Sequence, residues 1–414
     1  MENSIFKDDF VTTKQAIIYE RKPVSDFAAK IEADKALCDC DKAIAFSNEV
    51  NSRKVADFEK DGIDQMCHVS TFVCADDTIF MSYYANTENP EENPDFQVAR
   101  LAYAPIDNPT DKTIFDIQGA GEYLDGLRVN KVYDTILMQR EDNPQTIYIL
   151  WTADVGGNYY RLYRTFDIKT KTLGKTYPNR FKVGDIVNDF SSSGMQNALS
   201  ENGIGYKEFF SDIGIMQKLS TRVENGETYY YTGTYSGNFT CIIKSRDLIE
   251  WEYVAQPNEG ANGTGFENET KWENAVYVLD NKVYYFVRQW DPEYDEDKKL
   301  TAGSPYGILT TYDLDTKEWA KPVLVGDCQS RSDFIVYNDC LYLFYAPTDR
   351  EHIGILKINT DDISKTEVVL QANMNGSCFY PFVQYFGNDG ELAISYTVSR
   401  KHIRLARFTL SEYI

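Results

Sequence analysis

Six segments of the chain share one pattern of hydrophobic and polar positions. In each, an apolar strand-like run is followed by a polar turn of two to four residues and then by a second run rich in Tyr, Phe and Val. β-Branched and aromatic residues on both sides of a short polar turn predict a β-hairpin. The six predicted hairpins are residues 67–85, 133–153, 212–234, 271–289, 330–347 and 377–397.

The turns of these hairpins contain residues that tolerate tight backbone angles. Asn, Asp and Gly adopt the left-handed conformations that short hairpin turns require. The turns are Asp76-Asp77, Asn143-Pro144, Asn225-Gly226, Asp280-Asn281, Asn338-Asp339 and Asn388-Asp389-Gly390. A further strand-like run follows every hairpin, over residues 96–104, 159–167, 239–247, 306–314, 352–359 and 402–410.

The hairpin starts lie on average 62 residues apart. A regular period with about four short strands per unit is the signature of a β-propeller. We therefore predict an all-β fold, a single β-propeller of six blades, with five blades as the main alternative. The last unit reaches Ile414 after three strands, so we expect an N-terminal strand at residues 43–47 to close the ring.

Helix-like sequence is confined to residues 26–42. We therefore expect residues 1–42 to form an extension packed on the propeller and residues 43–414 to form the propeller domain. The composition agrees with a β fold, because aromatic residues make up 14% of the chain, with 30 Tyr and 23 Phe.

The chain carries 42 Lys and Arg against 64 Asp and Glu, a net charge of −22. Such a protein repels nucleic acid and anionic membranes, so both are poor partners. A local arginine cluster can still attract a small acidic ligand, because salt screens charges that lie more than about 10 Å away.

The N-terminus has no signal-peptide core, and no stretch approaches the ~20 apolar residues of a membrane helix. The eight cysteines are scattered, and the one close pair, Cys38 and Cys40, is too tight for a usual zinc knuckle. We expect reduced thiols, a cytoplasmic location and, with only three dispersed histidines, neither a metal site nor a cofactor.

Candidate functional residues are the polar side chains at the ends of the predicted hairpin strands, because the inner strands of a propeller meet at its axis. Unpaired buried charge is costly, so such a set forms either an ion-pair network or a ligand site. The candidates are His68, Asp95, Asp212, Glu273, Arg288, Arg331, Asp333, Tyr380 and Arg400.

Two segments resemble the sialidase (neuraminidase) superfamily. Glu273 precedes Arg288 by 15 residues across one hairpin, and Phe379-Tyr380-Pro381-Phe382-Val383 is similar to the segment with the nucleophilic tyrosine. The resemblance implies that Tyr380 is the nucleophile, that Glu273 polarises it and that Arg288 binds the substrate carboxylate.

The resemblance extends to three further positions. Arg331 matches the place of a second substrate-binding arginine, and residues 93–100 resemble the loop of the aspartate acid/base, which nominates Asp95. The family's opening Arg-Ile-Pro motif is replaced by His68-Val69-Ser70, so its first arginine is missing. Residues 245–251 resemble the Asp-box (BNR) repeat of this family, with Ser, Asp and Trp but no glycine.

The chemistry of these residue types fits an acidic sugar. Two arginines such as Arg288 and Arg331 can bind the carboxylate of a sialic or uronic acid. A tyrosine that is hydrogen-bonded to a carboxylate can lose its proton as it attacks, and sialidases use such a nucleophile. Asp95 would protonate the leaving oxygen and then activate water. We predict a retaining, exo-acting glycoside hydrolase with Tyr380, Glu273 and Asp95 as catalytic residues.

Three alternatives remain open. A five-bladed glycosidase of the arabinosidase or fructosidase type would use carboxylates such as Asp95, Asp212 and Glu273. His68 could hydrogen-bond the substrate or act as the base of a histidine-dependent glycosidase or lyase. A non-catalytic glycan-binding propeller would keep the pocket without turnover.

All of these hypotheses predict that the protein binds a carbohydrate. None of them predicts its oligomeric state. Asp212 and Asp333 are expected among the residues that bind the carbohydrate. Trp290 is a candidate for stacking on a sugar ring, as is Trp151.

Overall fold

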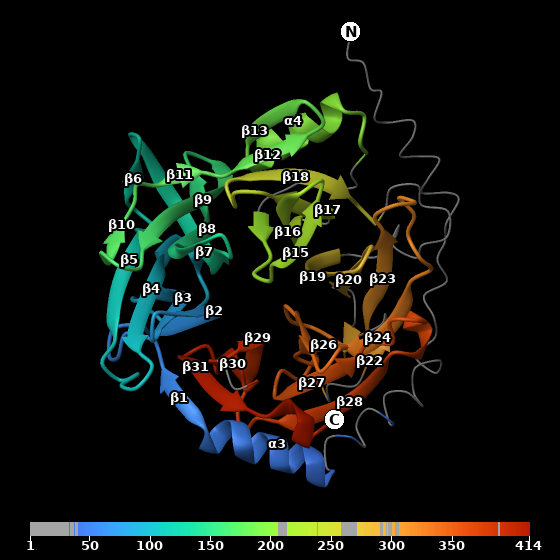
Figure 1. Ribbon diagram of the computed structural model, residues 1–414. Coiled ribbons are helices and arrows are strands. Elements are labelled where there is room, and N and C mark those ends of the chain that lie inside the picture. Colours follow the sequence, from blue (N-terminus) through green and yellow to red (C-terminus); the bar gives the residue numbers. More distant parts are fainter. Residues whose placement is uncertain are drawn as a thin grey trace.

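The fold is described from a computed structural model of the chain. The structure describes residues 40–205, 213–237, 239–257, 271–289, 306–387 and 390–414, the short stretches 293–294 and 300–302, and positions 33, 37 and 296. Six large sheets surround a central axis (Figure 1). The predicted all-β propeller is therefore confirmed.

Four of the six sheets have four antiparallel strands each, as in a regular propeller blade. The first blade contains β2 Met66–Ala75, β3 Thr78–Asn86, β4 Gln97–Pro105 and β5 Thr113–Gly119. The next contains β19 Lys271–Leu279, β20 Lys282–Gln289, β23 Tyr306–Asp313 and β24 Val323–Asp327. It is followed by β25 Asp333–Tyr337, β26 Cys340–Tyr345, β27 His352–Lys357 and β28 Glu367–Asn373. The last contains β29 Cys378–Tyr385, β30 Leu392–Val398, β31 His402–Phe408 and β1 Lys54–Asp57.

The other two sheets lie between the first and second of these blades along the chain. One has six strands: β6 Tyr123–Leu124, β7 Leu127–Arg140, β8 Asn143–Val155, β9 Asn158–Asp167, β10 Thr172–Leu173 and β11 Tyr177–Pro178. The other has seven: β12 Arg180–Val183, β13 Ile186–Asp189, β14 Ile213–Ile215, β15 Ser220–Glu224, β16 Glu227–Ser236, β17 Phe239–Ser245 and β18 Glu250–Ala255.

The seven-stranded sheet departs most from the form of a blade. Its strand β12 pairs in parallel with β18, and β14 and β15 follow one another along the same edge of β16. The ring therefore consists of five blades and one curled sheet. The prediction of six blades is partly wrong, and the alternative of five matches the four four-stranded blades together with the six-stranded one.

Short elements complete the structure. They are the helix α4 Ser192–Glu201, the hairpin of β21 Glu293–Tyr294 and β22 Leu300–Ala302, and the 3-10 turns η1 Pro94–Phe96, η2 Ile363–Lys365 and η3 Leu410–Glu412. Within the described residues, no helix is long and apolar enough to cross a membrane. The seven cysteines that the structure describes are free thiols.

An N-terminal strand closes the ring, but it is not the predicted one. Residues 43–47 lie in the helix α3 Asp41–Ser52, and β1 pairs with β31 instead. The physical reason is the spacing of Ala43, Phe46, Ser47 and Val50, which places all four on one buried helical face. Phe46 packs edge-on against Phe408 at 5.3 Å. The predicted helix at 26–42 and the extension 1–42 lie almost entirely outside the described residues.

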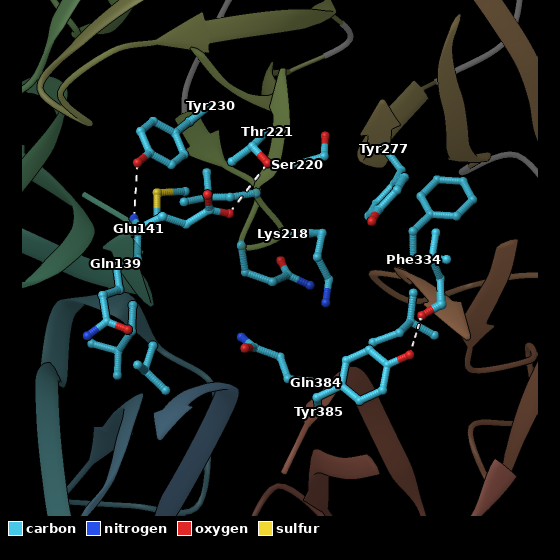
Figure 2. A pocket seen from close by; sticks show the side chains of 17 residues that line it. Gln139, Glu141, Lys218, Ser220, Thr221, Tyr230, Tyr277, Phe334, Gln384 and Tyr385 are labelled. Atoms are coloured by element: carbon cyan, nitrogen blue, oxygen red, sulfur yellow. Dashed lines mark hydrogen bonds between the residues drawn. The ribbon is translucent and has the colours of Figure 1, made fainter. Parts of the chain in front are cut away.

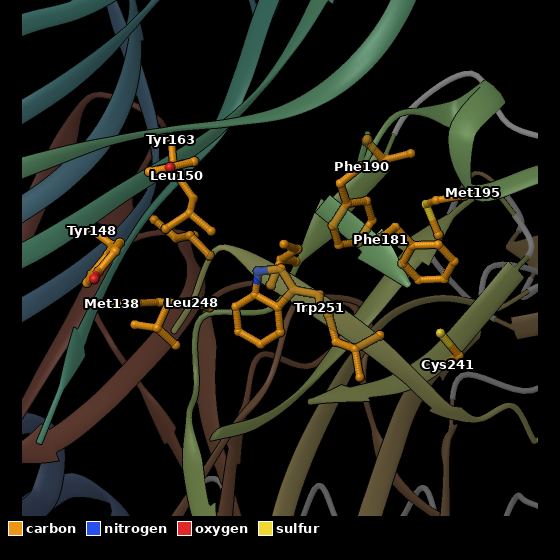
Figure 3. Packing of buried hydrophobic residues seen from close by; sticks show 14 of the residues in the cluster. Met138, Tyr148, Leu150, Tyr163, Phe181, Phe190, Met195, Cys241, Leu248 and Trp251 are labelled. Atoms are coloured by element: carbon orange, nitrogen blue, oxygen red, sulfur yellow. The ribbon is translucent and has the colours of Figure 1, made fainter. Parts of the chain in front are cut away.

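The hydrophobic core lies within the sheets and between neighbouring ones. The cluster in Figure 3 joins the six-stranded and seven-stranded sheets and includes Trp251, which is fully buried among Leu150, Tyr163 and Leu248. The predicted stacking residue Trp151 is also fully buried, in a cluster with Phe166. It therefore cannot stack on a ligand, because the aromatic excess of the sequence is used here for packing between strands.

The Asp-box-like segment, residues 245–251, forms the turn between β17 and β18. The carboxylate of Asp247 accepts hydrogen bonds from the amides of Ile249 at 2.8 Å and Glu250 at 2.9 Å. Ser245 Oγ accepts one from the amide of Leu248, whose φ of 63° takes the left-handed conformation without a glycine. The side chains of the motif thus stabilise the turn, and Leu248 adopts a backbone conformation that is unfavourable for a residue other than glycine.

We expect Asp247→Ala to lower the free energy of unfolding by about 2 kcal/mol, because two amides lose a charged acceptor. Urea denaturation measures the change. Asp185→Ala, at an exposed position, is the control and should change stability by less than about 0.5 kcal/mol. Equal effects of the two substitutions would contradict this account of the turn.

Candidate active site

The inner strands of the ring are interrupted at the positions that carry the candidate residues. The strands β2, β7, β15, β19 and β29 surround the central opening in Figure 1. Bulges in the strand pairing lie between His68 and Thr71, Tyr133 and Ile136, Lys271 and Asn274, and Phe379 and Phe382. β-Bulges redirect side chains and are common beside active sites.

Backbone conformation at these bulges is unusual. Val69, Asp134 and Tyr380 have φ values of 54°, 54° and 52°, in the region that non-glycine residues rarely adopt. In the seven-stranded sheet the inner edge is interrupted between β14 and β15, where Gln217 and Lys218 lie. Such strain clusters at functional sites.

Near these interruptions of the inner strands, five side chains form a chain of alternating charges. Arg288 donates to Glu273 at 2.6 Å, and Arg331 lies between Glu273 at 3.2 Å and Asp134 at 2.5 Å. Arg161 donates to the other oxygen of Asp134 at 2.9 Å. None of the five is more than 4% exposed. Pairing compensates their desolvation, and three guanidinium groups against two carboxylates leave one positive charge.

Tyr380 lies against this charged group and is partly exposed. Its amide donates to Ser330 Oγ at 2.9 Å, and the guanidinium of Arg331 lies 5.2 Å from its ring centre. Burial opposes the charge of Arg288, but the carboxylate of Glu273 and then Tyr380, to which Arg288 hydrogen-bonds, raise the pKa of Arg288. Burial, and then the charge of Glu273, raise the pKa of Tyr380 to about 12, so the phenol is protonated at neutral pH.

His68 supports the ring of Tyr380. The two rings stack at 4.4 Å with an angle of 20°, and His68 Nδ1 lies 3.1 Å from Thr397 Oγ1. The imidazole is 1% exposed. Its pKa is held well below the usual value by burial and then by the charges of Arg400, Arg350, Arg331 and Arg288. A neutral imidazole thus occupies the position at which the resemblance implies an arginine.

Sequence reasoning missed Arg350, which lies in the turn between β26 and β27. Its Nη2 donates to the carbonyl of Gln329 at 2.7 Å, and its guanidinium lies 5.2 Å from the ring centre of Phe379. Among the described residues it has no carboxylate partner at salt-bridge distance. Burial lowers its pKa, and the neighbouring Tyr380 and Arg288 also act on it.

Arg400, in the turn between β30 and β31, lies beside the same aromatic residue. Its guanidinium is 5.2 Å from the ring centre of Phe379, and it is paired with Glu92. Arg400 was among the candidates from the sequence, and topology could have added Arg350. In an antiparallel blade, the connection between the second and third strands lies on the same face as the start of the first strand. We call this the site face.

The predicted acid/base Asp95 lies at the edge of the site face, on η1 between β3 and β4. Its side chain is 56% exposed and 4.0 Å from Lys131 Nζ. Another carboxylate of the same connection, Glu92, accepts from Tyr84 Oη at 2.5 Å, and Tyr84 packs edge-on against His68 at 5.8 Å. These contacts link Glu92, rather than Asp95, to the histidine and tyrosine pair.

Three other candidates have different outcomes. Asp333 is buried and pairs with Lys218 Nζ at 3.1 Å, further along the inner strands than Arg331. Burial raises its pKa to about 6. Asp212 and Trp290 lie outside the described residues.

One group in the described part of the chain has ligand atoms close enough to share a metal ion, namely Asp57, Glu59 and His402, all within 4.8 Å. Their contacts are otherwise explained. His402 Nδ1 lies 2.7 Å from Glu59, and Asp57 accepts from Arg404 at 3.0 Å. These pairs fasten the N-terminal strand β1 to β31 and close the ring.

Comparison with known proteins gives matches in structure alone. No family model matches the sequence, and no curated protein matches it. A mutant of Trypanosoma rangeli sialidase that displays trans-sialidase activity superimposes with a TM-score of 0.51 at 13% identity, over 87% of this chain and 57% of that one. The K499G mutant of NanB sialidase from Streptococcus pneumoniae gives 0.51 at 9% identity, over 87% and 71%.

This chain has a sialidase-like propeller fold. The chain spans less than two thirds of the trypanosomal protein's length, and the identity is low enough that the likeness concerns the fold alone. The function of this sialidase-like propeller has to be argued from its own side chains.

Proposed function

We propose that this sialidase-like propeller is a glycoside hydrolase that removes a terminal acidic sugar, a sialic or uronic acid, with retention of configuration. The observation that carries the proposal is the position of Tyr380. Tyr380 is partly exposed, and its side chain hydrogen-bonds to Arg288, which is paired with the buried Glu273. A nucleophile in contact with a charge network and open to solvent is the arrangement that covalent catalysis requires.

The first step forms a bond between Tyr380 Oη and the anomeric carbon, while the bond from that carbon to the leaving oxygen breaks. The phenol is protonated at rest, so its proton has to leave as it attacks. Glu273, whose charge acts on Tyr380, is the acceptor that we assign. A neutral phenol also avoids bringing an anion against the carboxylate of the substrate.

Asp95 is the proposed acid/base, which gives its proton to the leaving oxygen. In the second step the Asp95 carboxylate takes a proton from water and the water oxygen bonds to the anomeric carbon. The bond between that carbon and Tyr380 Oη breaks, and the released phenolate regains its proton from Glu273. Asp95 lies in a connection on the site face, and its exposed carboxylate leaves it free to approach a bound substrate. Two displacements give retention.

Arg350 is the residue that we assign to the carboxylate of the substrate. The guanidinium groups of Arg288 and Arg331 already bind Glu273, whereas Arg350 is half-buried without a carboxylate partner in the described structure. A ligand carboxylate would compensate its charge, and arginine forms paired hydrogen bonds with a carboxylate. Arg288 is close enough to Arg350 to affect its pKa and is the second positive group at this position.

In this proposal His68 is a positioning residue. Its burial behind Tyr380 leaves the imidazole no route to the substrate, and its stacking holds the phenol ring in place. The alternatives with a histidine base or three carboxylates would instead require His68 or Asp212 to contact the sugar.

Aryl glycosides of sialic, glucuronic and neutral sugars test the proposed function. Release from an acidic glycoside, and not from a neutral one, is the expected result. Binding of acidic sugars without release would indicate a glycan-binding propeller, and release from neutral sugars alone would point to a different glycosidase class.

We expect Arg350→Met to reduce kcat/KM for the acidic glycoside about 100-fold, because one charged partner of the carboxylate is lost. The folding of the variant is checked by thermal denaturation, and Arg180→Met, at an exposed position on β12, serves as the control. An unchanged kcat/KM in Arg350→Met would remove this residue from the site.

A further inference from the structure

A cavity of about 360 Å³ lies at the centre of the ring (Figure 2). It is lined by residues of the inner strands, among them Gln139 on β7, Thr221 on β15, Tyr277 on β19, Phe334 on β25 and Gln384 on β29. Its volume falls within the range of about 300–1,000 Å³ that is usual for small-molecule sites.

This cavity is separate from the candidate active site. On β2, β7, β19 and β29, its lining residues follow the site residues along the chain: Val73 follows His68, Leu137 follows Asp134, Tyr277 follows Glu273 and Gln384 follows Tyr380. Three to five residues of strand span roughly 10–16 Å. Because every inner strand runs in this direction, the cavity opens toward the face of the ring opposite the site face. We call this the far face.

A polar layer separates the two sites. Gln217 Oε1 accepts a hydrogen bond from Arg331 at 3.5 Å, and Lys218 Nζ donates to the carbonyl of Val383 at 2.6 Å and pairs with Asp333. Both Gln217 and Lys218 also line the cavity. Gln217 is only 4% exposed, and its amide nitrogen has no hydrogen-bond acceptor within the described structure. A buried amide donor in this position has its hydrogen-bonding capacity available to a ligand.

The lining provides neutral hydrogen-bonding groups and aromatic faces. Tyr277 points its hydroxyl toward the cavity in Figure 2, and this hydroxyl has no partner among the described residues. The amide nitrogen of Gln384 donates to the carbonyl of Phe72 at 3.0 Å, which leaves its oxygen as an acceptor. The ring of Tyr385 forms part of the wall.

The charges of the lining do not favour an ion. The ammonium group of Lys218 is matched by the buried carboxylate of Asp333 at 3.1 Å, and Glu141 is at the exposed edge of the cavity. A carboxylate ligand would therefore find no unpaired cation, and a cation would meet the lysine. Donors and acceptors in similar number, beside aromatic rings, suit the hydroxyl groups and apolar faces of a sugar.

We infer that the far face of the ring holds a second, non-catalytic site for one neutral monosaccharide unit, bound by Gln217, Tyr277 and Gln384. This site goes beyond the proposed hydrolase activity and does not depend on it, because it uses different residues and a sugar without a carboxylate.

Saturation-transfer NMR with galactose and N-acetylglucosamine tests the inference on the full chain. Wild type should show transfer to at least one of these sugars. Gln384→Leu should raise its Kd about tenfold and Tyr277→Phe about fivefold, each through loss of hydrogen bonds. The milder Tyr277→Phe keeps the test valid if Gln384→Leu does not fold.

Tyr380→Phe separates the two sites and should leave the Kd of the neutral sugar unchanged. Absence of transfer to both sugars would overturn the inference. So would a Kd that neither far-face substitution changes, or one that Tyr380→Phe raises, because the sugar would then be bound elsewhere.

Discussion

Tyr380→Phe is expected to reduce kcat for the acidic-sugar glycoside at least about 1000-fold, while the Kd of the free acidic sugar stays within about twofold. The substitution removes one oxygen, the proposed nucleophile. It retains the ring that stacks on His68 and lies beside Arg331. A large effect on turnover with little effect on binding is therefore specific to a chemical role.

Steady-state kinetics and calorimetry measure these two quantities. Tyr385→Phe removes a hydroxyl from the far face, where Tyr385 Oη donates to the carbonyl of Val336. It should leave kcat unchanged. A Tyr380→Phe protein with nearly normal kcat would exclude the tyrosine mechanism and favour a carboxylate nucleophile.

Glu273→Gln is expected to abolish turnover and to lower the free energy of unfolding by about 3–5 kcal/mol. Glu273 pairs with Arg288 at 2.6 Å, and it shares Arg331 with Asp134. Loss of its charge leaves a buried guanidinium without compensation. Glu273 thus stabilises the centre of the ring and, in the proposed mechanism, also polarises the hydroxyl of Tyr380.

Urea denaturation of Glu273→Gln and of a matched control measures the stability effect. Glu227→Gln removes the same charge from the exposed pair with Arg246 and should change stability by less than about 1 kcal/mol. If both substitutions have the same small effect, the buried network is not what holds the inner strands together.

Much of the fold could be predicted because each blade is a local pattern. The turns at Asp76-Asp77, Asn225-Gly226 and Asp280-Asn281 fall between paired strands as expected. The turn predicted at Asn143-Pro144 lies two residues earlier, because β8 begins at Asn143. Apolar side chains alone did not distinguish a strand from a helix at 43–47, where the spacing of buried positions is helical.

The site was harder to predict because it depends on contacts between blades. Glu273 and Arg288 face each other across one hairpin, so their pairing is visible in the sequence. The partners of Arg331 are not, since Asp134 comes from a different sheet. Arg350 carries no motif, and only its place in the connection between the second and third strands of its blade could have indicated it. Its approach to Tyr380 depends on the ring bringing this blade beside β29.

The central claim is that Tyr380 forms a covalent bond with an acidic sugar. A fluorinated acidic-sugar fluoride of the class that the enzyme hydrolyses should accumulate the intermediate, and peptide mass spectrometry then locates it. We expect the added sugar mass on the peptide that contains Tyr380, and none in Tyr380→Phe. Sugar mass on Asp95, Glu273 or another carboxylate, or turnover with inversion and no adduct, would contradict the account.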